Sequence, residues 1–424
     1  MKRVLALLLI YISLFAQSQL LSPIPVPTTI LIDLDPTVYD DAMLEEALAE
    51  GEIFTFLAKS KQTENSELAL LRQTYSALFN LKEKIYGGGV FSIAFIVSPK
   101  MIGKYAASTT NSALAYLLNR GIPFEMELYT IADESNQTLR ETLEKISANS
   151  YNLVVAPITQ KGADYLCHQF LPTKFYIPTL HSNRTTCSNK LISFGGIDYN
   201  RQIETLSYLV ESNATTITVS DRSALSTMLS ETVYNYVDVN DSILLGQNGY
   251  YKEIILQHED LNQSTIFLNT PVVKSSLFLS QVTLADFQPL LVLSTQINYS
   301  PLLLTLTQYH DRENMVLASS IGSMDPFLTE NISLIGQDIR FNWLNYATVV
   351  GIDYFFGMDM GAHRLGKEMF TDHSLEYEVR LFEAGLYRFV PKEIPFPQEE
   401  IIEPYEEEEG PEPYAPISQA DISE

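Results

Sequence analysis

The side chains best suited to chemistry are not spaced for it in this 424-residue chain. Its six histidines form no His-Glu-x-x-His motif and no pair four residues apart, which a helical zinc site needs. There is no Gly-x-Ser-x-Gly elbow and no Ser-x-x-Lys motif for a serine nucleophile. Carboxylates are plentiful, but no spacing singles out an acid–base pair. We therefore predict a non-catalytic protein with no metal and no cofactor.

The two cysteines, Cys167 and Cys187, lie twenty residues apart and form no Cys-x-x-Cys motif. Cysteines of exported proteins are usually paired, so we predict a disulfide between them. Two buried free thiols are the alternative.

The N-terminus has the pattern of a signal peptide over residues 1–18. A basic start, Met1-Lys2-Arg3, precedes the apolar run Val4–Phe15 and the small-residue cleavage site Ala16-Gln17-Ser18. The apolar run is shorter than the roughly 20 residues of a membrane span, although an uncleaved anchor is the alternative. We expect an exported, periplasmic protein with no membrane span after cleavage.

The formal net charge of −25 is concentrated at the C-terminus. Residues 393–424 carry eleven Asp and Glu and no Lys or Arg, which leaves about −14 for the rest. This balance argues against nucleic-acid binding, which needs basic surfaces. We predict that residues 391–424, rich in Pro and Glu, form a disordered acidic tail.

Polar side chains follow the short apolar runs that read as strands. Because ligands of open α/β sheets bind beyond the carboxyl ends of the strands, these residues are the candidate binding site. For Ser98, Thr159 and Asp221 the alternative role is to cap the following helix, and for His181 it is an ordinary surface loop. The candidates are Ser98, Thr159, His181 and Ser182 in a first lobe and Asp221, Thr295 and Tyr299 in a second.

The elements that must position these residues alternate between strand and helix. Apolar runs at 90–97, 124–131 and 152–156 are separated by helical segments at 102–118 and 137–148, which indicates βαβ units with a parallel sheet. Strands at 174–177 and 191–194 and a helix at 199–211 follow. A second series of strands is predicted at 216–219, 242–245, 265–268, 289–293 and 315–318, and a mostly apolar helix at 342–356.

We therefore predict an α/β fold with two Rossmann-like lobes. Before them, an extended arm leads to a hairpin of two helices, 40–58 and 64–86, the second with an apolar stripe formed by Leu68, Leu71, Tyr75, Leu78 and Leu81. A C-terminal β-hairpin is predicted from 377–381 and 386–389. The expected boundaries are 19–89 for arm and helical hairpin, 90–212 for lobe 1, 213–325 for lobe 2, and 326–390 for the return to lobe 1 and the β-hairpin.

Three segments resemble the type I periplasmic-binding-protein superfamily. Val154–Thr159 (VVAPIT) is similar to the V-x-G-P-x-x-S end of that superfamily's third strand, and Ile177–Leu180 (IPTL) to the I-P-x-I-x-x-S end of the fourth. Gly351–Tyr354 (GIDY) resembles its late G-Y/I-D-A helix. The resemblance covers roughly residues 90–357.

The superfamily includes the solute-binding subunits of amino-acid ABC importers and the penicillin-binding-protein activators. The resemblance implies one of two functions. The first is to hold a small polar, amino-acid-like ligand in the cleft between the lobes, which close on it. The second is to act, without a ligand, as a scaffold for an envelope protein partner such as a peptidoglycan synthase.

Seven Asn-x-Ser/Thr sequons occur, and four have an acidic residue two positions earlier. An acid there resembles the extended sequon of bacterial oligosaccharyltransferases. Chance is the alternative. The four candidate glycosylation sites are Asn136, Asn213, Asn240 and Asn262; the other sequons begin at Asn183, Asn298 and Asn331.

Overall fold

The computed structural model describes residues 37–63, 65–79 and 90–394, together with residues 31, 33, 35 and 81. The predicted signal peptide and extended arm lie outside these residues, and so do residues 395–424 of the predicted disordered tail. The start of the tail was predicted wrongly, because Pro391 and Lys392 belong to a strand, Phe389–Lys392. In the part of the chain that is described, no helix has the length and apolar character to cross a membrane.

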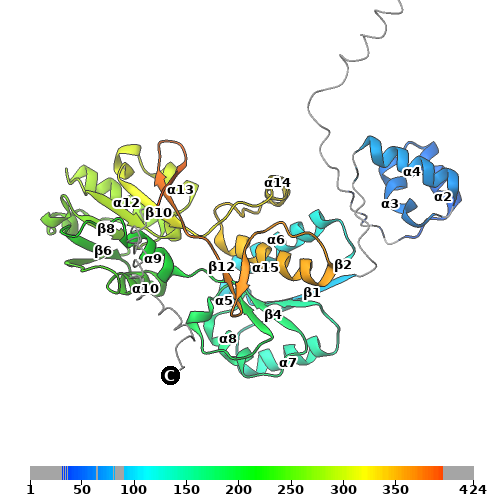
Figure 1. Ribbon diagram of the computed structural model, residues 1–424, viewed down its shortest axis with the longest axis horizontal. Coiled ribbons are helices and arrows are strands. Elements are labelled where there is room, and N and C mark those ends of the chain that lie inside the picture. Colours follow the sequence, from blue (N-terminus) through cyan, green and yellow to red (C-terminus); the bar gives the residue numbers. More distant parts are fainter. Residues whose placement is uncertain are drawn as a thin grey trace, which may run out of the picture. The chain divides into compact units, whose positions relative to one another are not determined.

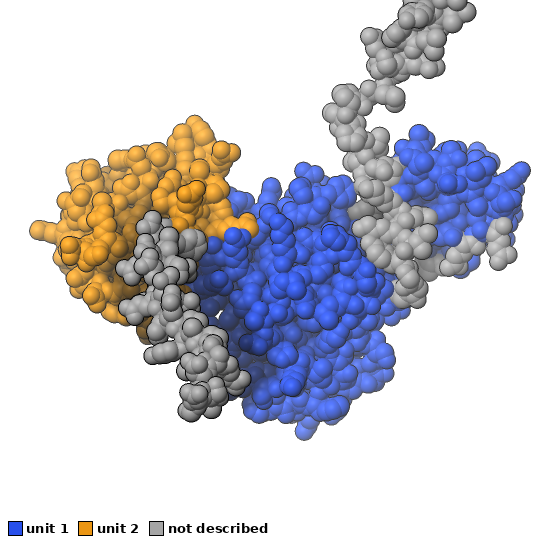
Figure 2. Space-filling view, viewed as in Figure 1, with its two compact units in different colours: residues 1–202, 295–305, 319–379 blue, residues 203–294, 306–318, 380–424 orange. Residues whose placement is uncertain are grey.

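The chain is divided into two compact units, coloured separately in Figure 2. Unit 1 comprises residues 1–202, 295–305 and 319–379, and unit 2 comprises residues 203–294, 306–318 and 380–424. Each unit is therefore assembled from several separate stretches of sequence.

The described residues before residue 82 form three α-helices rather than the predicted two: α2 (Asp41–Ala49), α3 (Ile53–Lys59) and α4 (Ser66–Leu78). Gly51 adopts φ +79°, a left-handed conformation that ends the first helix. A short 3-10 helix, η2 (Ser60–Gln62), follows α3.

The predicted apolar stripe of α4 was also partly wrong. Leu68 is buried, but Leu71 and Leu78 are 40% and 64% exposed. Arg72 takes the next buried position of the helix because its guanidinium donates to the carbonyl of Leu57.

Unit 1 contains a seven-stranded sheet in the order β11-β12-β5-β4-β3-β1-β2 (Figure 1). Strands β1 to β5 run parallel, β12 joins β5 in parallel, and β11 is antiparallel to β12. The two three-residue strands β11 and β12 were not predicted. The strands are β1 (Phe91–Val97), β2 (Phe124–Thr130), β3 (Leu153–Val155), β4 (Lys174–Ile177), β5 (Ile192–Phe194), β11 (Met369–Thr371) and β12 (Ser374–Glu376).

Both faces of this sheet are covered, and β1 shows how. Phe91, Ile93 and Phe95 enter one core with α6 and α15, whereas Ala94 and Ile96 enter the other with α7 and α8. Figure 1 shows the two helix pairs on opposite sides of the sheet. The helices are α5 (Pro99–Ile102), α6 (Tyr105–Arg120), α7 (Asn136–Ser147), α8 (Gln160–Cys167), α14 (Pro326–Leu334) and α15 (Trp343–Met360).

The Gly-Ile-Asp-Tyr segment lies in α15, where it is needed for packing. A Cβ on Gly351 would come within 2.1 Å of the Tyr176 ring, so only glycine fits there. Asp353 is fully buried and accepts a 2.8 Å hydrogen bond from the Tyr116 hydroxyl, and the Arg120 guanidinium lies 3.7 Å away. The motif therefore fastens α15 to α6 and β4.

Unit 2 contains a second seven-stranded sheet, in the order β14-β13-β10-β9-β8-β6-β7. Strands β6 to β10 are parallel, and β13 and β14 form an antiparallel hairpin at one edge. The strands are β6 (Thr216–Ser220), β7 (Asp241–Leu244), β8 (Thr265–Leu268), β9 (Leu291–Ser294), β10 (Met315–Ser319), β13 (Arg380–Ala384) and β14 (Phe389–Lys392). The helices are α9 (Tyr199–Ser207), whose first residues belong to unit 1, α10 (Ala224–Val233), α11 (Lys252–Leu256), α12 (Val272–Leu284) and α13 (Pro301–Leu306), shared with unit 1.

The predicted α/β fold with two lobes and parallel sheets is confirmed. The predicted C-terminal hairpin is present, but its strands lie about three residues later than predicted. The last residue of β13, Ala384, pairs with the first residue of β14, Phe389, so the turn lies between them. Tyr377, which was assigned to this hairpin, is instead buried in unit 1 and donates a 2.6 Å hydrogen bond to the Gly195 carbonyl.

Candidate functional site

The strand-end residues of unit 1 lie at three neighbouring positions of its sheet. Ser98 follows β1, and Thr159 follows β3, on one side of β1. The segment 131–135 follows β2 on the other side and contains Glu134, which is not among the candidates predicted from the sequence.

Ser98 is fully buried directly after β1. It occupies the N-cap position of α5, but its side chain makes no capping hydrogen bond, and its hydroxyl has no hydrogen-bond partner. A buried hydroxyl without a partner is uncommon because it loses its hydrogen bonds to water. Among the described residues, the Ser98 hydroxyl is therefore a buried polar group that is left without a partner.

Thr159, at the N-cap position of α8, is bound to Glu134. Its backbone N–H lies 3.1 Å from each carboxylate oxygen, and its hydroxyl donates a short hydrogen bond to Oε2. Glu134 is 2% exposed. A Cβ on Gly162 would lie 2.8 Å from Oε2, so the glycine makes room for the carboxylate. Thr159 thus binds an internal anion rather than capping α8 with its own side chain.

The remaining candidates of the first lobe are less buried. His181 and Ser182 are partly exposed, and the His181 Nδ1 accepts a 3.2 Å hydrogen bond from the Asn183 backbone N–H. Ser182 begins the 3-10 helix η3 (Ser182–Arg184). These contacts hold the loop after β4 in place.

Asp221, after β6 in unit 2, is 3% exposed and paired with Lys274, whose Nζ lies 2.5 Å from Oδ2. Oδ1 accepts hydrogen bonds from the Ser223 N–H at 2.9 Å and from its hydroxyl at 2.6 Å. Burial alone would raise the pKa of Asp221, but the hydrogen bonds from Lys274 and Ser223 outweigh it and hold the pKa below its usual range. The cap of α10 is Ser223, not Asp221.

Thr295 and Tyr299 were predicted to lie in the second lobe, but both belong to unit 1. Thr295 is fully buried, and its hydroxyl, like that of Ser98, has no hydrogen-bond partner. The Tyr299 ring packs 5.3 Å from that of Phe341, between centroids.

A buried polar cluster next to Thr295 was also not foreseen. The Gln202 side chain accepts a 3.0 Å hydrogen bond from the Gln296 backbone N–H and donates a 2.7 Å hydrogen bond to the Ser320 hydroxyl. The side-chain Oε1 of Gln296 accepts a 2.7 Å hydrogen bond from the Ser320 backbone N–H. All three are less than 5% exposed. Gln296 and Ser320 lie 94 and 118 positions after Gln202, so no local sequence pattern predicts the cluster.

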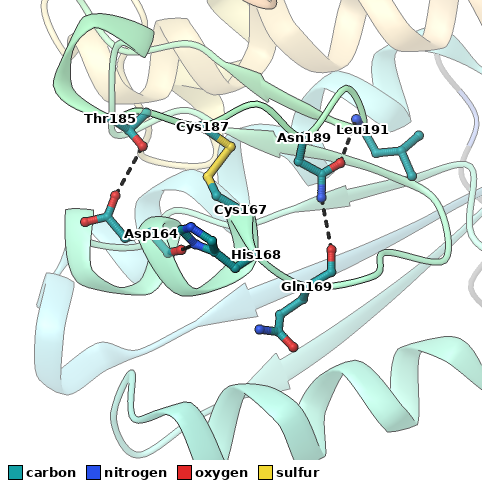
Figure 3. Close-up of a disulfide and its surroundings, with 8 residues drawn as sticks. All are labelled: Asp164, Cys167, His168, Gln169, Thr185, Cys187, Asn189 and Leu191. Atoms are coloured by element: carbon teal, nitrogen blue, oxygen red, sulfur yellow. Dashed lines mark hydrogen bonds between the residues drawn. A yellow bond between two sulfur atoms is a disulfide. The ribbon is translucent and has the colours of Figure 1, made fainter.

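The predicted disulfide between Cys167 and Cys187 is present, with its Cα atoms 5.3 Å apart (Figure 3). Its surroundings are tied together by hydrogen bonds as well. The Thr185 hydroxyl donates to Asp164 at 3.1 Å, and Asn189 donates to a backbone carbonyl just after α8 at 3.0 Å. The disulfide therefore fixes the C-terminal end of the helix whose N-terminal end holds Glu134.

One group of residues in unit 2 has metal-ligating atoms close together: Asp241, His258 and Asp260, within 4.8 Å of one another. The His258 Nδ1 lies 2.6 Å from an Asp241 carboxylate oxygen, so these two groups already satisfy each other. Asp260 is exposed.

Two cavities of unit 2 lie at the amino ends of its strands, and neither is lined by a candidate residue. One, of about 400 Å³, is bordered by Thr216 at the start of β6 and by Asn240 before β7.

All four candidate sequon asparagines are exposed, whereas Asn298 is fully buried.

The fold was compared with known proteins. No protein-family model matches the chain, and no curated protein sequence matches it. Solved structures do match: the branched-chain amino acid transporter substrate-binding protein of Streptococcus pneumoniae in complex with isoleucine has a TM-score of 0.51 at 10% identity, over 72% of this chain and 100% of that one.

Two further structures give similar values. The leucine-, isoleucine-, valine-, threonine- and alanine-binding protein of Brucella ovis, in a closed conformation, has a TM-score of 0.54 at 10% identity, over 72% of this chain and 95% of that one. A solute-binding protein of Rhodopseudomonas palustris in complex with 4-hydroxybenzoate has a TM-score of 0.53 at 10% identity, over 72% and 96%. The resemblance to the type I periplasmic-binding-protein superfamily is therefore confirmed at the level of the fold.

Proposed function

We propose that this chain is an exported, non-catalytic binding protein for a small polar ligand of amino-acid size. The observation that carries the proposal is the pair of fully buried hydroxyls, on Ser98 and Thr295, that lack hydrogen-bond partners where β1 and β9 end. Ligands of open α/β sheets bind at such strand ends, and buried polar groups are nearly always paired when their site is filled.

The comparisons support the same class of function. The structural neighbours are transporter substrate-binding proteins, and two of them are in complex with a small molecule, isoleucine or 4-hydroxybenzoate. The disulfide and the signal-like N-terminus support an exported, periplasmic location. A ligand-free scaffold for an envelope enzyme, the alternative, draws no support from these neighbours.

A thermal-shift screen of amino acids, amines and short peptides tests the proposal. A ligand at a hundredfold excess over its Kd stabilises the folded state by about 2.7 kcal/mol. Ser98→Ala and Thr295→Val should weaken the shift caused by any ligand found, whereas Ser188→Ala, on an exposed loop, should not. Thr159 and Asp221 are unsuitable for this test because both are bound internally. A broad screen without any stabilising compound would contradict the proposal.

A further inference from the structure

We propose that Glu134 is a specificity residue that fills the N-terminal end of α8 with the chain's own carboxylate, so that the ligand is an amine that brings no carboxylate to this helix. This inference rests on the proposed function and adds the charge of the ligand to it. It starts from the hydrogen bonds between Glu134 and Thr159.

The N-terminal end of a helix attracts anions because its first N–H groups have no partner within the helix and its dipole is positive there. In α8 this anion is internal. Both carboxylate oxygens of Glu134 lie 3.1 Å from the Thr159 N–H, and the Thr159 hydroxyl also donates to Oε2. The two donors that Thr159 would offer to a ligand carboxylate are therefore already used.

The position of Glu134 is built into the surrounding structure. The residue reaches Thr159 from 25 positions earlier in the chain, and it is 2% exposed. Gly162, in the first turn of α8, leaves the space that the carboxylate fills, since a Cβ there would lie 2.8 Å from Oε2. Ser98 directly follows the nearby strand β1, and its buried hydroxyl has no partner among the described residues.

The negative charge of Glu134 disfavours anionic ligands at the N-terminal end of α8. Among the described residues, no Lys, Arg or His lies within ion-pair distance of Glu134, in contrast to Asp353 and Asp221. A ligand carboxylate would meet a like charge at short range, and such juxtapositions strongly weaken binding. An ammonium group instead supplies the missing positive charge. The net charge of −25 further raises the concentration of cations near the protein.

The first experiment asks whether Glu134 occupies a carboxylate site. Glu134→Ala removes a fragment equivalent to acetate. We expect sodium acetate to raise the Tm of the Glu134→Ala protein in a saturable way, relative to sodium chloride at equal ionic strength, and to bind it at least about tenfold more tightly than it binds the wild type. Glu134→Gln, which keeps the space filled, should not respond to acetate.

If Glu134→Ala does not fold in chloride, the same comparison is made on refolding yield in acetate and in chloride. An equal response of the wild type, or no acetate effect on either Tm or refolding of the Glu134→Ala protein, would overturn the inference.

The second experiment uses matched pairs of an amino acid and its decarboxylated amine, such as arginine and agmatine or leucine and isoamylamine. The wild type should prefer the amine, and Glu134→Ala should shift the ratio of affinities toward the amino acid by about tenfold or more. A wild type that binds amino acids and prefers them to amines would contradict the inference but leave the proposed function standing. If the wild type binds neither member of any pair, the proposed function loses support, whereas the acetate result on Glu134→Ala still decides whether Glu134 occupies the site.

Discussion

The two units each bury a carboxylate near the carboxyl ends of their parallel strands, but they compensate its charge differently. In unit 2, Asp221 has Lys274 at 2.5 Å and two hydrogen bonds from Ser223. In unit 1, the hydrogen bonds to Glu134 from described residues come from the N–H and hydroxyl of Thr159. The first carboxylate therefore belongs to an ion pair, whereas the second is bound by neutral donors and no described cation lies within ion-pair distance of it.

The largest effect is expected from removing the compensating charge in unit 2. Lys274→Met leaves Asp221 buried without its partner, and breaking a buried pair in this way costs about 3 to 4 kcal/mol. Urea unfolding at pH 7 measures the loss. The double variant Lys274→Met/Asp221→Leu should recover much of it, because it leaves no unpaired charge; a single variant as stable as the wild type would contradict the ion-pair interpretation.

A similar effect is expected from the disulfide, which lies in unit 1 alone. Replacing Cys167 and Cys187 by serine opens a loop of about 20 residues and should lower the free energy of unfolding by about 3 kcal/mol. Because the bond holds the far end of α8, the variant should also weaken acetate binding to Glu134→Ala. Unchanged stability would mean that the hydrogen bonds around the bond suffice.

A smaller effect is expected at Glu134. Glu134→Gln keeps the shape and one acceptor oxygen, so it should cost only about 1 kcal/mol, measured by urea unfolding. Asp221→Asn, its counterpart in unit 2, leaves Lys274 without its anion and should cost more. Equal losses from the two variants would remove the difference between the units.

The pH dependence sharpens the same comparison. The pKa of Asp221 is lower in the folded state than its usual value of about 3.9, so the unfolded chain takes up the proton first on acidification. The stabilisation is therefore complete above about pH 4 and is lost as the pH falls through the folded-state pKa. The stability difference between wild type and Asp221→Asn, measured from pH 6 to pH 3, should shrink accordingly; a constant difference would contradict this assignment.

The smallest effect on stability is expected from glycosylation. We predict that modification, if the native host performs it, occurs at the exposed Asn136, Asn213, Asn240 and Asn262 and not at the buried Asn298. In Asn240 and Asn262 the side-chain oxygen accepts a backbone hydrogen bond, which leaves the amide nitrogen for attachment. Intact-mass analysis of protein from its native host decides this; the unmodified mass alone would end the prediction.

The fold could largely be predicted from sequence because buried parallel strands are short apolar runs bounded by Pro, Gly or polar residues. The predicted strands 174–177 and 265–268 have the same bounds as β4 and β8, and the other predicted strands before the C-terminal hairpin differ by one or two residues at an end. The strands β11 and β12 were not predicted because each has only three residues of mixed polarity. Such a short segment is too short to show the alternation of apolar and polar residues that indicates a strand. The first helical segment was divided wrongly because a single glycine, Gly51, outweighed its apolar periodicity.

The candidate site could be predicted only in part. Ser98, Thr159, Asp221 and Thr295 were selected because each follows a strand, and each lies there; their role in binding stays a prediction. Their partners could not be found, since Glu134 and Lys274 lie 25 and 53 residues away and are brought in by the tertiary fold. Sequence position identifies the end of a strand, whereas the state of a polar group there depends on distant side chains.

The interleaved composition of the units has a consequence for synthesis of the chain. Tyr116 of α6 binds Asp353 of α15, which follows 237 residues later, after the first two stretches of unit 2. At typical elongation rates the ribosome needs roughly 10 to 50 s to make that stretch. Until α15 emerges, the apolar side of β1 is covered by α6 but lacks the part of its core that α15 supplies. Nascent chains that end before residue 343 should therefore be prone to aggregation and should bind chaperones, however much of the first sheet they already contain.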